Sequence, residues 1–341
     1  MTPTTIHTDL VIVGAGPTGL YGAFCAGFRG LSTVLVDALP QAGGQIAALY
    51  PEKVVRDVAG LPAVTGRELV DGLAAQADAF GTRYLLERQA VGLGREAGRP
   101  QLTLSDGTIV DAGAVVLTAG IGTFTPRALP AGEEFLGRGL SYFVPDLSAH
   151  TGRDVVVVGG GDSAIDWANA LVPLARSVTV VHRRARFRAH AASITEAERA
   201  GVVFRTNCEV TELIGDGRLS HVRVGDSLLR ADSVIAALGF ISDLGPLAGW
   251  GLELSGRTIV VDQRMRTNVP AVYAAGDVTE YPGKVRLMSV GFGEVATAVN
   301  NAAVELDPEA ALFPGHSTEA ALSPSHSTEA ALPPSHSTEG A

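Results

Sequence analysis

Cysteine is scarce in this sequence, which holds two in 341 residues, Cys25 and Cys208. They lie far apart along the chain, so neither a disulfide framework nor a Cys-x-x-Cys redox pair is available. We interpret both as buried structural thiols.

Long apolar runs are absent as well. No stretch approaches the roughly 20 apolar residues that cross a bilayer. Residues 1–8 are mostly polar and lack the apolar core of a signal peptide. We therefore expect a soluble, cytoplasmic protein that does not bind membranes.

Positive charge is in deficit. The chain has 26 basic and 36 acidic residues, a formal net charge of -10. It has no overall surface that would neutralise phosphates, so we expect no nucleic-acid binding, and an acidic protein partner would have to meet a local basic patch. In contrast, the 46% of hydrophobic residues and the 41 glycines indicate a turn-rich α/β protein of about two domains.

A glycine-rich motif follows the first predicted strand, residues 9–13. The segment Gly14-Ala15-Gly16-Pro17-Thr18-Gly19 fits Gly-x-Gly-x-x-Gly and precedes a predicted helix over 20–29. A second strand, 33–36, ends in Asp37, 23 residues after the first glycine. In this arrangement the helix N-terminus binds a pyrophosphate and the acid accepts hydrogen bonds from a ribose, so the pattern predicts a dinucleotide site.

A second motif of this kind follows the continuous apolar run Val155–Val158, typical of a buried parallel strand. Gly159, Gly161 and Ala164 give Gly-x-Gly-x-x-Ala, before a predicted helix to about residue 174 and a strand over 177–181. The pattern predicts a second dinucleotide site.

The two motifs differ in the residue at the position of the acid. Where the first motif has Asp37, the second has His182, followed by Arg183, Arg184 and Arg188. Planar guanidinium groups suit a ribose phosphate, which an acid would repel, so this site should prefer NADP(H) to NAD(H). The alternative is a solvated basic turn, which we disfavour because the run falls at the specificity position of a dinucleotide motif.

Together these patterns predict an α/β protein with two Rossmann-like dinucleotide-binding domains, the second inserted into the first. The proposed limits are 1–117 and 242–308 for the first domain, 118–241 for the second and 309–341 for a tail. Hinges are expected over 120–130 and 239–245. The other expected elements are helices over 66–80 and 289–306, a hairpin over 102–110, and strands over 114–120, 202–212, 221–224, 233–238, 258–261 and 272–277.

Over about residues 7–318 the chain resembles the thioredoxin-reductase-like flavoprotein reductases, whose first unit binds FAD and whose second binds NADPH. Thioredoxin reductases carry a Cys-x-x-Cys pair after a Gly-Arg-Gly turn. Here Gly137-Arg138-Gly139 leads into residues 140–145, which hold no cysteine. Dithiol exchange needs an attacking and a resolving thiol, so thioredoxin reduction is excluded.

Five segments resemble the cysteine-free relatives, the thioredoxin-reductase-like ferredoxin/flavodoxin:NADP+ reductases. The matching segments are 48–53, 160–164, 281–286, 291–294 and 298–301. The resemblance implies a homodimer in which hydride passes from NADPH to flavin N5 and electrons then leave singly to ferredoxin or flavodoxin. Alternatives are another acceptor, namely a quinone, oxygen or a dithiol protein, or a non-catalytic flavin-binding sensor.

The same resemblance implies the site residues, with no side-chain acid, base or metal in the reaction. The residues that would contact FAD are Gly14, Gly16, Thr18, Gly19, Asp37, Gly44, Gln45, Tyr50, Ala90, Phe124, Asp277 and Thr318. The residues that would contact NADPH are Gly159, Gly161, Asp162, Ser163, Ala164, His182, Arg183, Arg184 and Arg188. Tyr50 would stack on one flavin face; the alternative is that Tyr50 is an ordinary core or surface residue. Asp37 departs from the glutamate usual in the family.

The tail repeats with a period of ten from Glu309, in three copies of Glu-Ala-Ala-Leu-x-Pro-x-His-Ser-Thr. Three such copies are too few and too rich in proline for a solenoid. In the resembled family one Pro-x-His-Ser-Thr covers the second flavin face, often of the partner subunit, and His316 with Thr318 matches it by position. Metal binding by His316, His326 and His336 is the alternative, which ten-residue spacing on a flexible tail disfavours.

Overall fold

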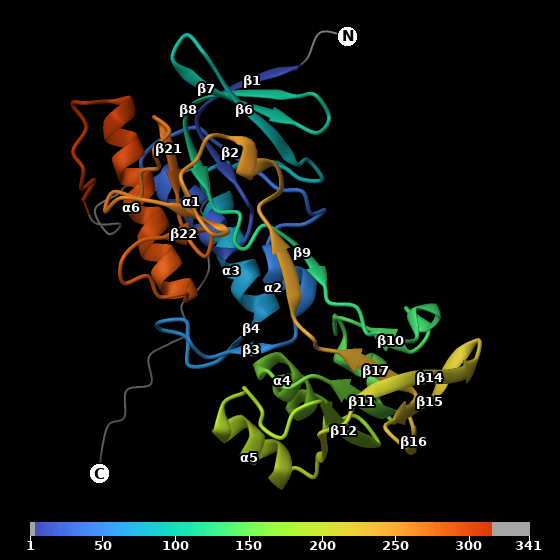
Figure 1. The fold of residues 1–341 in the computed structure, drawn as a ribbon. Coiled ribbons are helices and arrows are strands. Elements are labelled where there is room, and N and C mark those ends of the chain that lie inside the picture. Colours follow the sequence, from blue (N-terminus) through green and yellow to red (C-terminus); the bar gives the residue numbers. More distant parts are fainter. Residues whose placement is uncertain (1–3, 316–341) are drawn as a thin grey trace, which may run out of the picture.

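The computed structural model describes residues 4–315. Figure 1 shows two α/β lobes, one built from the blue-to-teal and orange-to-red parts of the chain and the other from the green and yellow parts. The chain leaves the first lobe, builds the second and returns. This confirms the predicted insertion of one α/β unit into another.

The first lobe is organised around a seven-stranded sheet in the order β5-β2-β1-β8-β7-β6, with β21 also paired to β8. Four pairs are parallel, β1 with β2 and β8, β2 with β5, and β8 with β21. The strands are β1 (Thr5–Val13), β2 (Thr33–Val36), β5 (Arg83–Leu85), β6 (Ala90–Glu96), β7 (Arg99–Leu104), β8 (Ile109–Leu117) and β21 (Val272–Ala274). The carboxyl-terminal halves of the central strands, residues 10–13 of β1 and 114–117 of β8, are wholly apolar and buried, which is typical of a parallel sheet covered on both faces.

Three helices pack on this sheet, with α1 (Pro17–Phe28) between α3 (Gly66–Asp78) and α6 (Met288–Leu306). Helix α1 begins three residues before the predicted start because Pro17 fits the first helical position. Thr65 and Glu68 form a capping box that fixes the start of α3. The helices predicted over 66–80 and 289–306 are thereby confirmed.

The second lobe holds a five-stranded parallel sheet, covered by α4 and α5, and a three-stranded antiparallel sheet. The parallel strands are β10 (Leu140–Ser141), β17 (Ser233–Ala236), β11 (Asp154–Val158), β12 (Ser177–His182) and β13 (Val203–Thr206). The helices are α4 (Asp162–Leu171) and α5 (Ala191–Arg199), and the antiparallel strands are β14 (Val210–Asp216), β15 (Arg218–Val224) and β16 (Ser227–Arg230).

Several predicted elements differ in detail. The single strand predicted over 202–212 is β13 and β14, in different sheets, because Asn207 adopts a left-handed backbone (φ 55°) between them. The hairpin predicted over 102–110 exists, but its second arm and the strand predicted over 114–120 are one strand, β8. Helix α5 and the short α2 (Gly44–Leu49) were not predicted.

The remaining elements are short. They are the strands β3 (Val54–Val55), β4 (Val64–Thr65), β19 (Leu254–Ser255), β20 (Thr258–Val260) and β22 (Thr279–Glu280), and 3-10 turns at Glu133–Phe135, Leu147–His150 and Gly245–Gly249. Within residues 4–315 no helix has the length and apolar character needed to cross a membrane.

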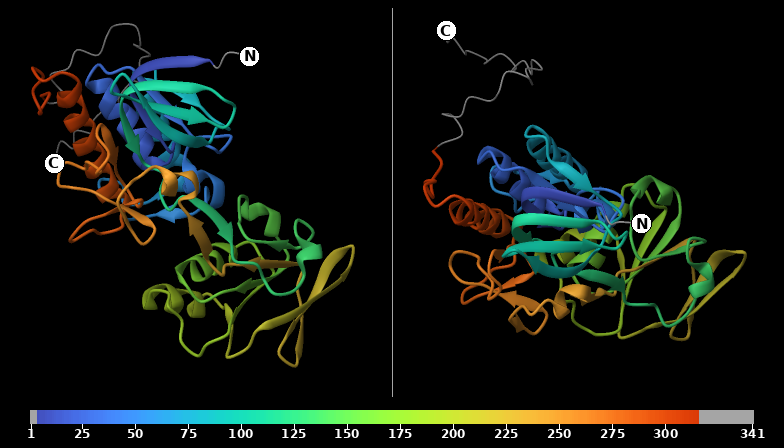
Figure 2. Two further views of the ribbon diagram at one scale, coloured as in Figure 1. Left: turned by 45° about the horizontal axis from the view of Figure 1, so that its top comes forward. Right: turned by 90° about the horizontal axis from the view of Figure 1, so that it is seen from above.

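The two connections between the lobes lie side by side. Strand β9 (Thr123–Pro126) pairs antiparallel with β18 (Phe240–Asp243), and Figures 1 and 2 show this ribbon between the lobes. Both strands fall in the stretches predicted as hinges. Rotation of the lobes about this ribbon stays a prediction.

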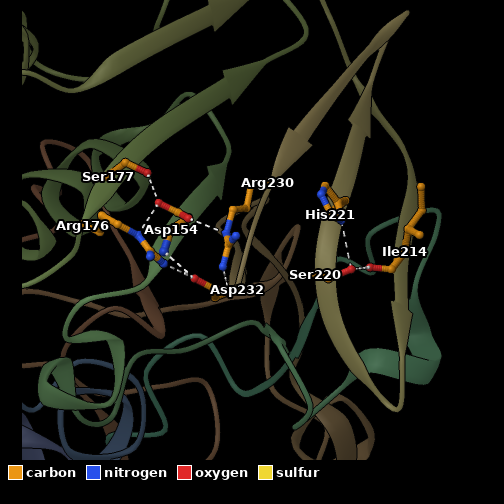
Figure 3. A network of polar contacts seen from close by, with 8 residues as sticks. All are labelled: Asp154, Arg176, Ser177, Ile214, Ser220, His221, Arg230 and Asp232. Atoms are coloured by element: carbon orange, nitrogen blue, oxygen red, sulfur yellow. Dashed lines mark hydrogen bonds and ion pairs between the residues drawn. The ribbon is translucent and has the colours of Figure 1, made fainter.

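A polar network fixes one end of the second sheet (Figure 3). Asp154, the first residue of β11, accepts hydrogen bonds from Ser177 Oγ at 2.8 Å and Arg176 Nε at 3.0 Å, and Arg230 Nε lies 3.0 Å away. Asp232 binds Arg176 at 2.8 Å. Burial opposes ionisation, but Ser177 and Arg176 hold the pKa of Asp154 below its ordinary value. This network lies at the opposite end of β11 from the glycine-rich turn at Gly159.

Candidate functional site

The first lobe contains a cavity of about 470 Å³ at the carboxyl ends of β1, β2 and β8. This volume lies within the range of small-molecule sites. Nine of the twelve predicted FAD contacts line it, namely Gly14, Gly16, Thr18, Asp37, Gly44, Gln45, Tyr50, Ala90 and Asp277.

Glycines make the wall of this cavity from bare backbone. A Cβ on Gly14, whose φ is 111°, would lie 2.5 Å from the Thr118 carbonyl oxygen, so only glycine fits. Gly19 lies off the cavity, and a Cβ there would be 1.8 Å from the Gly14 carbonyl oxygen, so it lets α1 pack on the turn. Gly16 precedes α1 without a side-chain cap, which leaves the first N–H groups of the helix free for an anion.

Asp37 directly follows β2 and lines the cavity. Its two carboxylate oxygens accept hydrogen bonds from the backbone N–H groups of Ala15 at 2.6 Å and Leu39 at 2.8 Å. Burial raises the pKa of Asp37, while these N–H donors oppose the rise. The sequence predicted a ribose acceptor; the structure shows that the same carboxylate also braces the glycine turn. Each oxygen keeps a further lone pair for a hydroxyl.

Tyr50 lies where the cavity meets the second lobe. Its hydroxyl is 3.5 Å from Gln45 Oε1, and its ring packs against the apolar cluster of the second lobe. Burial, followed by the Asp277 carboxylate, raises the pKa of its hydroxyl. Three residues later, Lys53 forms an ion pair with Asp166 of α4 at 2.5 Å. The segment predicted to face a flavin is therefore also a contact between the lobes.

The glycine turn of the second lobe follows β11. A Cβ on Gly159 would lie 2.4 Å from the Ala237 carbonyl oxygen, and Gly161 precedes α4 without a side-chain cap. Asp162 Oδ1 accepts a hydrogen bond from the His190 N–H at 2.9 Å, so this carboxylate anchors the start of α5. Ser163 is exposed and Ala164 is buried under the turn.

His182 ends β12 and turns its ring inward. A Cβ on Gly160 would lie 2.2 Å from the imidazole Cε1, and the ring stacks on Phe187 at 5.0 Å between centroids. The Arg188 N–H donates to the Gly160 carbonyl at 2.7 Å. The arginine segment is therefore folded back on the glycine turn.

The three arginines predicted to bind a phosphate, Arg183, Arg184 and Arg188, are exposed. In the described part of the chain their guanidinium groups form no ion pair with a carboxylate. Exposed guanidinium groups without a carboxylate partner, on a segment whose backbone binds the glycine turn, are suited to an anion.

Three predicted residues have no described side chain. Phe124 lies in β9, and only its backbone is described. His316 and Thr318 lie outside the described residues, as do His326 and His336.

The two cysteines lie in different lobes. Cys25 in α1 is buried, and burial raises its pKa to about 12. Cys208 is half-buried, and burial raises its pKa too. Both thiols are therefore kept protonated near neutral pH, which is unlike a reactive dithiol.

Comparison with known proteins agrees with this geometry. Residues 8–302 match the pyridine nucleotide-disulphide oxidoreductase family. A ferredoxin–NADP reductase of Salinispora tropica is 57% identical over 317 residues, covering 92% of this chain and 98% of the relative. One of Frankia alni is 58% identical over 315 residues, covering 91% and 98%.

Among solved structures, the thioredoxin reductase of T. acidophilum aligns with a TM-score of 0.76 at 28% identity, over 88% of this chain and 98% of that one. The fold is thus that of a thioredoxin reductase, while the two cysteines of this chain are far apart. The chain belongs to the pyridine nucleotide-disulphide oxidoreductase family and is similar over most of its length to members named ferredoxin–NADP reductase.

Proposed function

We propose that this protein is an FAD-dependent ferredoxin or flavodoxin:NADP+ reductase of the cytoplasm. One observation carries the proposal: a glycine-walled cavity in one lobe is paired with an unpaired arginine cluster in the other, in a chain without a dithiol. The names of its relatives supply the acceptor.

In this proposal the FAD-binding domain is formed by residues 1–117 and 242–308. The start of α1 and the turn Gly14–Gly19 would hold the pyrophosphate, and Asp37 would accept hydrogen bonds from the ribose. Gln45, Tyr50 and Asp277 would bind the rest of the cofactor, since they line the same cavity. When bound, FAD supplies the ring that takes a hydride and passes electrons on singly.

Residues 118–241 would form the NADPH-binding domain. The start of α4 after Gly161 would hold the pyrophosphate, and Arg183, Arg184 and Arg188 would bind the 2'-phosphate. The turn is preorganised, because the His182 ring and the Arg188 N–H both contact Gly160. The work of this chain is therefore to bind and orient both dinucleotides, with no acid or base among its side chains.

The tail, 309–341, would complete the site in a homodimer. By the family resemblance, His316 and Thr318 cover the face of the flavin opposite Tyr50, in the partner subunit. Hydride delivery by NADPH then requires access to that face. Rotation about the β9–β18 ribbon or displacement of the tail would provide it.

Anaerobic titration of the purified FAD-loaded protein with NADPH tests this function. We expect flavin absorbance to bleach with NADPH and to return on addition of ferredoxin. A ferredoxin rate no higher than that with oxygen or a quinone would favour another acceptor. A protein that binds flavin but does not bleach would be a non-catalytic sensor.

A further inference from the structure

A buried ion pair lies beneath the turn at Gly276 and Asp277, which lines the cavity. Lys284 Nζ contacts Glu294 Oε1, and the side chains are 2% and 4% exposed. Because desolvation offsets the attraction between buried charges, such a pair contributes little net stability, and in some proteins it is retained for the conformation it specifies. The contacts of this pair show which conformation that is.

Both members of the pair bind the backbone of one residue, Gly276. Glu294 Oε2 accepts a hydrogen bond from the Gly276 N–H at 2.7 Å, and Lys284 Nζ donates to the Gly276 carbonyl at 3.0 Å. Thr279 Oγ1 donates to the same carbonyl at 2.7 Å. The backbone of Gly276 has φ of 83°, a conformation that needs glycine. Side chains thus hold both polar groups of this residue.

Tyr281 completes the network. Its hydroxyl donates to Glu294 Oε1 at 2.6 Å, and the Lys284 ammonium lies 5.5 Å from its ring centroid. Burial, followed by Glu294, raises the pKa of Tyr281 to about 12, so the hydroxyl stays a donor across the neutral range.

Helix α6 brings this network against the cavity wall. Gly291 and Glu294 lie three residues apart and so share one face of the helix. A Cβ on Gly291 would be 2.7 Å from Thr18 Oγ1 and 3.3 Å from Gly276 Cα. The helix therefore touches Thr18 and Gly276 directly, and both line the cavity.

We propose that Lys284 and Glu294 are positioning residues of the cofactor site. They fix the backbone of Gly276 so that Asp277 lies in the cavity in the conformation that binds the cofactor. Lys284 and Glu294 do not contact the cofactor themselves. The inference rests on the proposed FAD site. A purely structural role would stabilise the lobe and leave the affinity for FAD unchanged.

The test uses the full chain with FAD bound and three variants, Lys284→Met, Glu294→Leu and the double variant. Released FAD is measured by its fluorescence on dilution, and thermal unfolding is followed by circular dichroism. We expect each single variant to raise the dissociation constant of FAD about tenfold or more. The double variant buries no lone charge and should regain part of the lost unfolding temperature, but it should not regain FAD affinity because the Gly276 N–H still lacks its acceptor.

Asp154→Asn is the matched control, since it breaks an ion-pair network that lies in the other lobe (Figure 3). It should lower the unfolding temperature and leave the dissociation constant of FAD within about twofold. Tyr281→Phe keeps both charges and therefore tests the same network if a charge variant does not fold. We expect it to raise the dissociation constant of FAD about threefold.

Two results would overturn the proposal. One is FAD affinity within about twofold of the unsubstituted protein in every variant of the network. The other is FAD affinity that returns together with stability in the double variant. If the unsubstituted protein itself holds no FAD, the proposed FAD site is wrong, which is a separate outcome.

Discussion

The two glycine turns share one backbone plan but carry side chains of opposite charge at the positions that follow the second strand. In the first, the Asp37 carboxylate is turned back on its own turn and bonded to the Ala15 N–H at 2.6 Å. In the second, the His182 ring fills the equivalent space against Gly160, and the charges that follow are exposed guanidinium groups. A single fold thus carries a carboxylate, proposed to accept hydrogen bonds from a ribose, in one lobe and exposed guanidinium groups, proposed to bind a phosphate, in the other.

The turns also differ in enclosure. The first opens into a cavity of about 470 Å³ closed by residues from α2, from residues 244–247 and from the start of α6. The arginines of the second are exposed. A cavity of this size suits a resident cofactor, and exposed arginines suit a substrate that must exchange. Variants of each turn test this contrast.

The largest effect is expected from Gly14→Ala. The added Cβ would meet the Thr118 carbonyl oxygen at 2.5 Å, and φ of 111° is strained for alanine. We expect the purified variant to hold less than about a tenth of the FAD of the unsubstituted protein, measured by absorbance at the flavin band. Gly161→Ala is the control, since nothing lies within 4 Å of its Cβ. It should keep FAD and raise only the Michaelis constant for NADPH; equal loss of FAD in both would remove the contrast.

The next effect concerns the choice of nucleotide. Replacing Arg183, Arg184 and Arg188 by alanine should raise the Michaelis constant for NADPH far more than that for NADH. The loss of charged hydrogen bonds should cost about 1–3 kcal/mol for NADPH. Steady-state kinetics with both nucleotides measures this. A parallel rise for NADH would mean that the segment supports the fold and does not select the phosphate.

Most of this contrast between the two turns could be predicted from the sequence, because the contrast depends on short local patterns. In each lobe 23 residues separate the first glycine of the turn from the residue at the specificity position, so Asp37 and His182 could be found without a structure. The neighbours of these residues could not. That Asp37 braces Ala15, or that Asp162 anchors His190 28 residues away, depends on where a side chain turns after folding.

The hydrogen bonds of Lys284 and Glu294 to the backbone of Gly276 were not predicted, for a related reason. Residues 281–286 and 291–294 were singled out as matching segments, but a lysine and a glutamate in sequence are usually solvated. Only the folded structure shows that Lys284 and Glu294 are buried, with side chains 2% and 4% exposed. Helix α5 was missed because its apolar face is small, with Ala197 as its one buried residue.

A smaller effect is expected on the stability of the second lobe. The pKa of Asp154 is lowered in the folded protein, so this carboxylate adds stability above its ordinary pKa, and the gain is lost as pH falls through the lowered value. Asp154→Asn should therefore destabilise by about 2 kcal/mol at neutral pH, less as the pH drops below about 3.8. Chemical denaturation across this range measures it. A pH-independent difference would mean that packing, not charge, is lost.

The smallest effect is expected in the tail, where the sequence repeats one element three times. If His316 and Thr318 of the first copy cover the flavin, a chain that ends after Thr318 should keep the flavin spectrum and the NADPH–ferredoxin turnover nearly unchanged. A chain that ends after Gly315 loses the His-Ser-Thr of every copy and is the matched control; its flavin spectrum and turnover should both change. Activity lost already on ending after Thr318 would place the functional cover in a later copy. In that case, replacing His316 alone by alanine in the full chain should change turnover little, because the later copies carry the same His-Ser-Thr. A large loss of turnover in this variant would mean that the first copy alone covers the flavin.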